Sequence, residues 1–191
     1  MPDAPFGPTV ARFDEAADAW FARLRGNPIT DRAFYLASAL GDHSLIWHLS
    51  GFTRAAVPDG SLRDAIELSA TLGVESVLVN LGLKSLFSRT RPVHEGDRPH
   101  MLRQPLTSSF PSGHASAAFV AAALLSDHRP LPEKALWYGL AGVVATSRVY
   151  VKIHHASDVV AGAAVGIALG AAAKRIWRGV NRNLPAPAGV G

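Results

Sequence analysis

The sequence predicts an all-α fold, a bundle of helices embedded in a membrane. In the N-terminal part, apolar residues recur at the spacing of one face of an α-helix. Residues 62–87 form a segment long enough to cross a bilayer at about 1.5 Å per residue, and residues 157–177 are apolar and rich in Gly and Ala. Neither an internal repeat nor a long linker divides the chain. We therefore expect a single domain over residues 1–183 and a disordered tail over residues 184–191.

The composition narrows the class of protein. Of the 191 residues, 48% are hydrophobic and 18% are charged, a balance that excludes collagen-like and disordered chains. The chain contains no cysteine, which excludes disulfides, thiolate metal sites and a cysteine nucleophile. The net charge of +4 favours anionic partners such as nucleic acid, anionic lipids or phosphorylated substrates.

The N-terminal region lacks the pattern of a signal peptide, which is a basic segment followed by an apolar core. From Phe13 to Leu24, apolar residues at helical spacing alternate with charged ones, and this predicts an amphipathic helix. Such a helix fits a membrane interface and the surface of a soluble core equally well. A break at residues 26–28 and a short helix over residues 30–40 follow, so residues 10–40 are expected to form interfacial helices.

Capping residues mark the next helix. Gly41 is expected at the C′ position of the preceding helix, and Asp42 at the N-cap of a helix that runs to about residue 56. A turn over residues 58–60 ends this part of the chain.

The long helix over residues 62–87 is expected to begin at Ser61 as its N-cap. It contains Glu67 and Glu75, and charged groups at membrane depth are costly. We expect both carboxyl groups to be paired or hydrogen-bonded locally rather than catalytic.

A polar, proline-rich loop follows over residues 88–111, and a loop of this length inside a compact domain is usually functional. It carries four arginines, Arg89, Arg91, Arg98 and Arg103. Three further helices are expected, over residues 113–126, 133–150 and 157–177. In the last of these, Gly162, Gly166 and Gly170 form two G-x-x-x-G spacings on one face, which favours close helix packing.

Residues suited to binding an oxyanion come from separate segments. Lys84, Arg91 and Arg148 provide three cations, and arginine forks with a lysine point charge suit a phosphate. Ser112 and the backbone N–H of Gly113 stand at the start of a helix, where free N–H groups and the helix dipole favour anions. Together these residues predict a phosphate site.

Two histidines and a carboxylate are suited to chemistry on such an anion. His154 and Asp158 are four residues apart and share a face if the segment is helical. A carboxylate on one imidazole nitrogen fixes the tautomer and leaves the other nitrogen free to attack. His114 is then a candidate general acid for the leaving oxygen, a role worth ~10²–10⁴-fold in rate. Each residue alone has a simpler structural explanation, and it is their combination that points to catalysis.

The combined pattern resembles the three-part signature of the type 2 phosphatidic acid phosphatase superfamily, which also includes vanadium-dependent haloperoxidases and some bacterial acid phosphatases. Every signature position is filled. The segments read Lys84-x₆-Arg91-Pro92, then Pro111-Ser112-Gly113-His114, then Ser147-Arg148-x₅-His154-x₃-Asp158.

The resemblance implies a helical bundle of the phosphatidic acid phosphatase/haloperoxidase type and hydrolysis of phosphate esters without a metal or other cofactor. It implies that His154 is the nucleophile and forms a phosphohistidine, that Asp158 orients it, and that His114 protonates the leaving group and later activates water. It assigns the phosphoryl oxygens to Lys84, Arg91, Ser112, Gly113 and Arg148. Vanadate is expected to occupy the same site as an inhibitor.

The other histidines do not belong to the signature. His155 follows the nucleophile where an aromatic or apolar residue is common, and we expect it to line or pack against the site. The remaining ones, His43, His48, His94, His100 and His128, match nothing in the signature and are expected to have structural roles.

The short, apolar chain favours an integral membrane enzyme acting on lipid phosphates or diphosphates such as phosphatidic acid, phosphatidylglycerol phosphate or polyprenyl phosphates, with no nucleic acid partner. The alternatives are a phosphatase of soluble esters, a vanadium-dependent haloperoxidase and a binding protein without activity. The intact histidine–aspartate pair argues against the last, because binding alone needs only the cations.

The charge distribution predicts an orientation in the membrane. Trp137 and Trp177 are expected near one interface, on a side that also carries Arg129, Lys134, Lys174, Arg175, Arg178 and Arg182. A positive cluster of this kind favours the cytoplasmic side, which would place the catalytic loops on the outer face. The arginine-rich, alanine-rich usage suggests a bacterial source. We expect a multi-pass protein of the cell membrane with four or five crossings.

Overall fold

The computed structural model describes residues 5–58, 60–95 and 97–182, and every regular element within them is a helix. Three short segments supplement the α-helices: the 3₁₀ turn η1 (Asp42–Ser44), the π segment η2 (Leu78–Gly82) and the 3₁₀ segment η3 (Leu83–Leu86). The predicted all-α bundle is confirmed, and the expected tail lies outside the described residues. The α-helices are α1 (Pro8–Ala22), α2 (Pro28–Leu40), α3 (Leu45–Ala55), α4 (Leu62–Val77), α5 (Gly113–Leu125), α6 (Leu131–Tyr150) and α7 (Ala156–Arg182).

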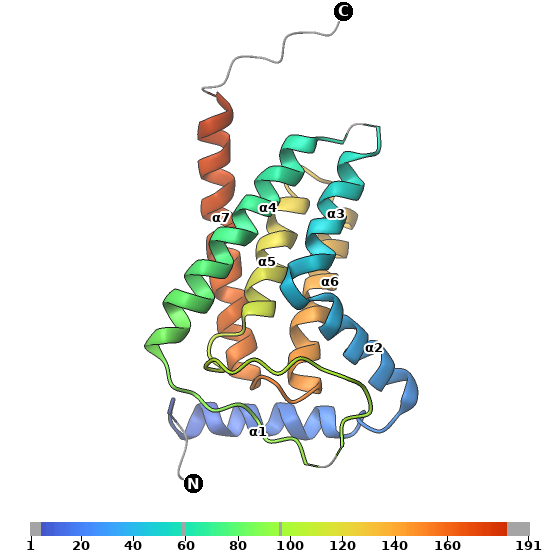
Figure 1. Ribbon diagram of the computed structural model, residues 1–191, viewed down its shortest axis with the longest axis vertical. Helices are drawn as coiled ribbons and strands as arrows, with labels where there is room; N and C mark the ends of the chain where they lie inside the picture. Colours follow the sequence, from blue (N-terminus) through green and yellow to red (C-terminus); the bar gives the residue numbers. More distant parts are fainter. Residues whose placement is uncertain (1–4, 59, 96, 183–191) are drawn as a thin grey trace, which may run out of the picture.

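Helix α5 is the centre of the bundle. Helices α3 to α7 run along the length of the molecule, and α1 lies across one end (Figure 1). Helix α5 packs against α4, α6 and α7, and most of its alanines are fully buried. Its small side chains allow all three neighbours to approach closely.

The glycine stripe of α7 packs directly on α5, as predicted. A Cβ atom added at Gly162 would lie 2.4 Å from the carbonyl oxygen of Ser112, and one at Gly166 would lie 2.3 Å from that of Ser116. At Gly170 the added atom would lie 2.6 Å from a side chain of α5. Glycine is therefore required at these positions for the two helix backbones to meet.

The predicted long helix continues through α4, η2 and η3. It begins at Ser61, whose Oγ accepts the backbone N–H of Asp64 at 3.1 Å, as expected of an N-cap. After Val77 the hydrogen-bond pattern changes to π and then to 3₁₀, so the rod keeps its direction but not its α geometry. Among the described residues, Leu62–Leu86 and α7 are the helices long and apolar enough to cross a membrane, and α5 is apolar but shorter.

Two capping predictions are wrong. Gly41 ends α2 with a right-handed φ of −75°, so it is not a left-handed C′ residue. It is needed for space instead, because a Cβ there would lie 2.8 Å from His114 and 2.8 Å from Val144. Asp42 does not cap α3, since Ser44 precedes that helix and makes no side-chain cap. The carboxylate of Asp42 instead contacts His114.

Helix α1 differs from a simple amphipathic helix. Its aromatic residues Phe13 and Trp20 are 49% and 55% exposed, whereas Asp14 is buried. Phe21 faces the core and packs edge-on against Tyr150. The helix thus turns one carboxylate inward and leaves two apolar rings on its outer side.

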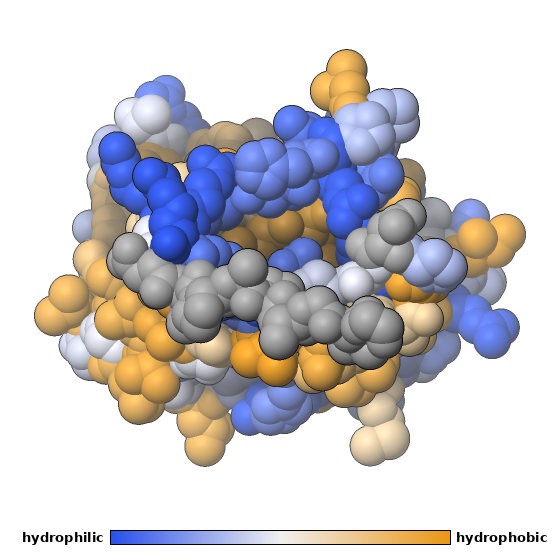
Figure 2. Space-filling view, turned by 90° about the horizontal axis from the view of Figure 1, so that it is seen from above, coloured by the Kyte–Doolittle hydropathy of each residue, from blue (hydrophilic) through white to orange (hydrophobic). Residues whose placement is uncertain are grey.

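The end of the bundle opposite α1 is polar and hollowed, while the flanks around it are hydrophobic (Figure 2). A cavity of about 430 Å³ at this end is lined by charged residues of α3, α4, α7 and the α5–α6 turn, including Arg54, Asp64, Asp127 and Arg178. Trp177 and Trp137, predicted at a membrane interface, are half-buried here: the former donates to Thr71 at 3.0 Å and the latter packs on the core. Polar ends and apolar flanks fit a membrane-associated protein.

Candidate active site

His154 lies in the short turn between α6 and α7. Lys152, with a left-handed φ of 52°, redirects the chain after Tyr150, and the backbone N–H of His154 donates to the carbonyl of Arg148 at 3.1 Å. Nδ1 of His154 lies 3.4 Å from Oδ2 of Asp158 in the first turn of α7, and both side chains are buried. The predicted pair is therefore formed, although His154 precedes the helix instead of lying within it.

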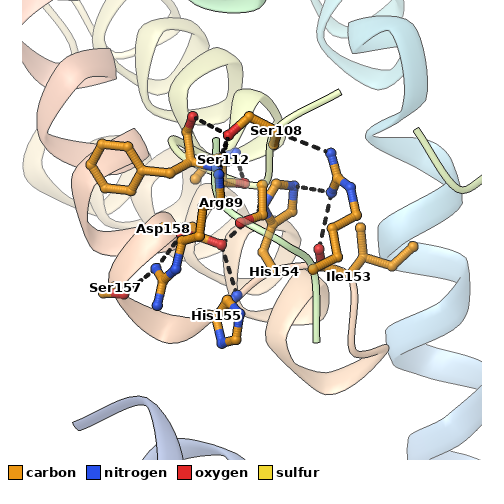
Figure 3. A network of polar contacts seen from close by, with 12 residues as sticks. Arg89, Ser108, Ser112, Ile153, His154, His155, Ser157 and Asp158 are labelled. Carbon is orange, nitrogen blue, oxygen red and sulfur yellow. Dashed lines mark hydrogen bonds and ion pairs between the residues drawn. The ribbon is translucent and has the colours of Figure 1, made fainter. Parts of the chain in front are cut away.

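A buried ion network, which the sequence did not reveal, holds Asp158 from behind (Figure 3). Its Oδ2 accepts the backbone N–H of His155 at 2.9 Å, and its Oδ1 lies 2.5 Å from Nη1 of Arg89. Nη2 of Arg89 lies 2.6 Å from Asp14 of α1, whose carboxylate also accepts the N–H and the hydroxyl of Ser157. An arginine of the loop and a carboxylate of α1 thus fix the orienting aspartate.

Arg148 supplies a buried cation with free donors. Its side chain is fully buried, and Nη1 donates to the hydroxyl of Ser38 on α2. Nε and Nη2 have no hydrogen-bond partner. Lys84 of η3 is also buried, and within the described part of the chain its ammonium makes no hydrogen bond or ion pair. Buried donors without partners are costly, so this pair of cations suits an incoming oxyanion.

The start of α5 borders the same space. The hydroxyl of Ser112 caps the helix by accepting a backbone N–H of its first turn at 3.4 Å, and the N–H of Ser112 donates to the carbonyl of Asp158 at 3.0 Å. A Cβ at Gly113 would lie 3.1 Å from the amide oxygen of Asn80 and 3.7 Å from the ammonium of Lys84. Asn80 is therefore a further residue of the site that no sequence motif indicated.

Arg91 lies beside the nucleophile, but its donors are occupied. Nη1 lies 3.2 Å from Nε2 of His154 and donates to the carbonyl of Ile153 at 3.0 Å. Nε and Nη2 donate to carbonyls of the polar loop, among them those of Pro105 and Thr107. Arg91 clasps the loop over the site in this structure, and its contact with a phosphoryl group stays a prediction.

His114, in the first turn of α5, is paired with a carboxylate. Nε2 of His114 lies 3.0 Å from Oδ1 of Asp42. Both His114 and His154 line one cavity of about 770 Å³, together with Lys84 and Gly113. The candidate acid and the candidate nucleophile therefore face a common space, and the role of Asp42 could not be read from its position in the chain.

Comparison with known proteins identifies the family. The sequence profile of the PAP2 superfamily matches residues 64–182, which is more than half of the chain. The chain belongs to the PAP2 superfamily. A PAP2-like relative, the decaprenylphosphoryl-5-phosphoribose phosphatase of Mycolicibacterium smegmatis, is 33% identical over 164 residues, covering 85% of this chain and 84% of that protein.

Solved structures agree with this assignment. The crystal structure of LpxE from Aquifex aeolicus has a TM-score of 0.69 and 25% identity, covering 88% of this chain and 96% of that one. A PAP2-type phosphatidylglycerolphosphate phosphatase from Bacillus subtilis shares the fold, with a TM-score of 0.66 and 24% identity over 93% of this chain and 90% of that one. With named phosphatases matching most of its length, this PAP2 protein is a phosphoric monoester hydrolase.

Burial and charge set the protonation states in the PAP2 site. Burial lowers the pKa of His154 to about 3, and the nearby arginines act in the same direction although the contact with Asp158 opposes them. His154 is therefore neutral at pH 7, the form that can attack phosphorus. Burial by itself would raise the pKa of Asp42, but the hydrogen bond and charge of His114 outweigh it and lower that pKa. Asp42 is thus ionised and stabilises a protonated His114.

The remaining candidates divide into those paired as expected and one that is not. His155 packs beside the site, with Nε2 3.3 Å from the carbonyl of Thr90. Glu67 pairs with Arg63 at 3.2 Å, as predicted. Glu75 is buried, and its Oε1 has no hydrogen-bond partner, so the prediction of local pairing is wrong for this atom.

The histidines outside the signature have structural contacts at three positions. These are His48 with Ser69 at 2.9 Å, His100 edge-on to Tyr35, and His128 with Asp127 at 3.5 Å. His43 is in the left-handed conformation with φ 53° and lines the cavity of the active site. His94 lies in the polar loop, where its Nε2 is buried without a partner.

Proposed function

We propose that this chain is a metal-independent lipid phosphatase that hydrolyses lipid phosphate or diphosphate monoesters through a phosphohistidine. Its candidate substrates are phosphatidic acid, phosphatidylglycerol phosphate and polyprenyl phosphates. One observation carries the proposal: the buried guanidinium of Arg148 has two free donors beside a neutral histidine that is backed by a carboxylate. The printed name of the mycobacterial relative, a phosphatase of a decaprenyl-linked phosphoribose, supports a lipid-linked substrate.

The first half-reaction transfers the phosphoryl group to His154. The attacking atom is Nε2, because Nδ1 faces Asp158. As the N–P bond forms, the ester P–O bond breaks and His114 gives its proton to the leaving oxygen. Asp158 stabilises the positive charge that develops on the imidazole. Arg91, now 3.2 Å from Nε2, exchanges that contact for a phosphoryl oxygen.

The second half-reaction returns the enzyme to its starting state. His114, now neutral, accepts a proton from a water that attacks phosphorus, and the N–P bond breaks to release inorganic phosphate. Lys84, Arg148 and the start of α5 hold the phosphoryl oxygens in both steps. Asp42 stabilises His114 whenever that ring is protonated.

We infer further that the protein crosses a bacterial cell membrane several times, with four or five spans, and that its site opens on the outer face. Two candidate spans and the apolar flanks of the bundle support this. Helix α1 lies across the end that holds the site, with Phe13 and Trp20 exposed as an interfacial helix requires. Lys174, Arg175 and Arg178 lie toward the opposite end of α7, which the positive-inside rule assigns to the cytoplasm.

The test is release of phosphate by detergent-solubilised protein from the three lipid classes and from a water-soluble ester, in the presence of EDTA. We expect release from at least one lipid, inhibition by vanadate, and complete loss in His154→Ala. The neighbouring variant His155→Ala is the matched control and retains activity.

Each contrary outcome changes a different part of the proposal. Loss of activity with EDTA in the wild type contradicts metal independence. Turnover of the soluble ester alone points to an acid phosphatase. Halide oxidation that requires added vanadate, without any release of phosphate, points to a haloperoxidase.

A further inference from the structure

The cavity of the active site extends well beyond the catalytic residues. Its volume of about 770 Å³ falls within the range of about 300–1,000 Å³ typical of small-molecule sites. From Lys84 the cavity follows the α4 rod back to Ser69, a span of roughly 22 Å at 1.5 Å per residue. A hydrogen bond of 2.9 Å between Ser69 and Nδ1 of His48 joins α4 to α3 at the far end. Figure 1 shows α3 and α4 spreading apart toward the α1 end, where the cavity lies between them.

The wall that α4 contributes to this cavity is polar, although the helix as a whole is apolar enough to cross a membrane. Ser69, Ser76, Asn80 and Lys84 recur along the cavity side at helical spacing. The outward side of the same rod exposes apolar residues, namely Ile66, Val74, Val77 and Leu81. An apolar tail would not be matched by such a wall, whereas hydroxyl groups would be.

Glu75 gives this wall an unused hydrogen-bond acceptor. Its side chain lines the cavity and is only 3% exposed, and its Oε1 has no partner. The hydroxyl of Ser116 on neighbouring α5 is buried and unpartnered as well. A buried carboxyl oxygen without a donor is costly, and a hydroxyl of a bound molecule would supply that donor. The carboxyl group offers an acceptor oxygen in either protonation state.

We propose that this cavity is a subsite for a hydroxylated leaving group, a glycerol or sugar unit that carries the phosphate to be removed. Glu75 accepts a hydroxyl of that unit, and Ser76 and Asn80 complete the polar wall. The cavity lies on the leaving-group side because His114, the proposed acid for the leaving oxygen, lines it. The proposal rests on the phosphatase function above and specifies its substrate class: lipids whose phosphate is borne by a polyol are preferred to those whose phosphate is borne by an alcohol without free hydroxyls.

The test compares phosphatidylglycerol phosphate, whose leaving oxygen belongs to a glycerol with a free hydroxyl, with phosphatidic acid of the same acyl chains. We expect wild-type kcat/KM to be at least about 10-fold higher on the former. Glu75→Leu should lower kcat/KM on the former by about 10- to 100-fold and on the latter by less than about 3-fold. Removing a negative charge favours the more anionic lipid, so a loss on that lipid reports the hydroxyl contact and not the net charge.

Two further variants control for folding. Glu67→Leu makes the same change two turns earlier on α4, where the carboxylate pairs with Arg63, and it leaves the ratio of the two kcat/KM values unchanged. Ser76→Ala alters an exposed residue of the cavity wall, so it does not disturb the core and shifts the ratio in the same direction by a smaller factor. The unfolding temperature in detergent is measured for each variant.

The outcomes separate the subsite from the phosphatase function itself. Equal wild-type rates on the two lipids, or equal losses on both in Glu75→Leu, overturn the subsite. If Glu75→Leu does not fold, an unchanged ratio in Ser76→Ala overturns it. Failure of the wild type to release phosphate from either lipid refutes the proposed function instead.

Discussion

The close packing of α7 on α5 holds the two halves of the site together, and Gly162→Ala tests this. The added Cβ would lie 2.4 Å from the carbonyl oxygen of Ser112, which is about 1 Å inside the 3.4 Å at which ordinary contact begins. Both groups belong to helix backbones, so the helices must separate by about that distance. Overpacking of this kind costs about 1–3 kcal/mol, against about 0.5–1 kcal/mol gained from Gly→Ala within a helix.

The same displacement reaches the chemistry. The N–H of Ser112 donates to the carbonyl of Asp158 at 3.0 Å, so a shift of α5 moves the oxyanion-binding residues relative to the nucleophile. A misplacement of 1 Å can cost on the order of 10²-fold in rate. We expect kcat/KM on a lipid phosphate to fall by about 10- to 100-fold, and the unfolding temperature to fall by about 2–4 °C per kcal/mol.

Two further glycines separate stability from catalysis. Gly170→Ala makes a similar clash at 2.6 Å, but about 12 Å farther along α7 from the site, so it should lower the unfolding temperature and leave kcat/KM nearly unchanged. Gly139→Ala on α6 meets nothing within 4 Å and should be neutral or slightly stabilising. If Gly162→Ala behaved like Gly139→Ala in both measurements, the packing of α5 on α7 would not be what positions the site.

Three further predictions concern the charges around the site. Asp42→Asn should lower kcat by about 10- to 100-fold and should have little further effect in a His114→Ala background; additive losses in the double variant would show that the two residues act separately. The pKa of His154 is lowered from 6.5 to about 3, so the folded chain stays unprotonated there while the unfolded chain takes up a proton as pH falls through this window. Thermal unfolding should therefore show stability decreasing from pH 6.5 downward, with a weaker slope in His154→Gln, whereas an equal slope in both proteins would contradict the lowered pKa. Arg89→Met leaves two buried carboxylates uncompensated and should cost about 3–5 kcal/mol of stability and most of the activity; Arg63→Met, which breaks a half-exposed pair, should cost less than about 1 kcal/mol, and similar losses in the two variants would refute the importance of the buried network.

The sequence by itself determined the fold class, the helix boundaries to within a few residues and the signature residues of the site. These properties are local. Helical spacing of apolar residues, a serine N-cap at Ser61 and glycines four apart on α7 each act over one or two turns, so they can be read along the chain. The histidine–aspartate pair was likewise foreseeable, because a separation of four residues brings the two side chains into contact at a helix start.

Only the tertiary structure decided what supports and surrounds these residues. Asp14 and Arg89 are 75 positions apart in the chain and meet because α1 crosses the end of the bundle. Asp42, which suggested a helix cap, pairs with His114 because Gly41 lets α5 approach. Which side of α4 faces a cavity, and that Glu75 lies there without a partner, depends on how α3 and α4 diverge around α5. Contacts of this kind have no sequence period, because burial far along the chain sets them and local geometry does not.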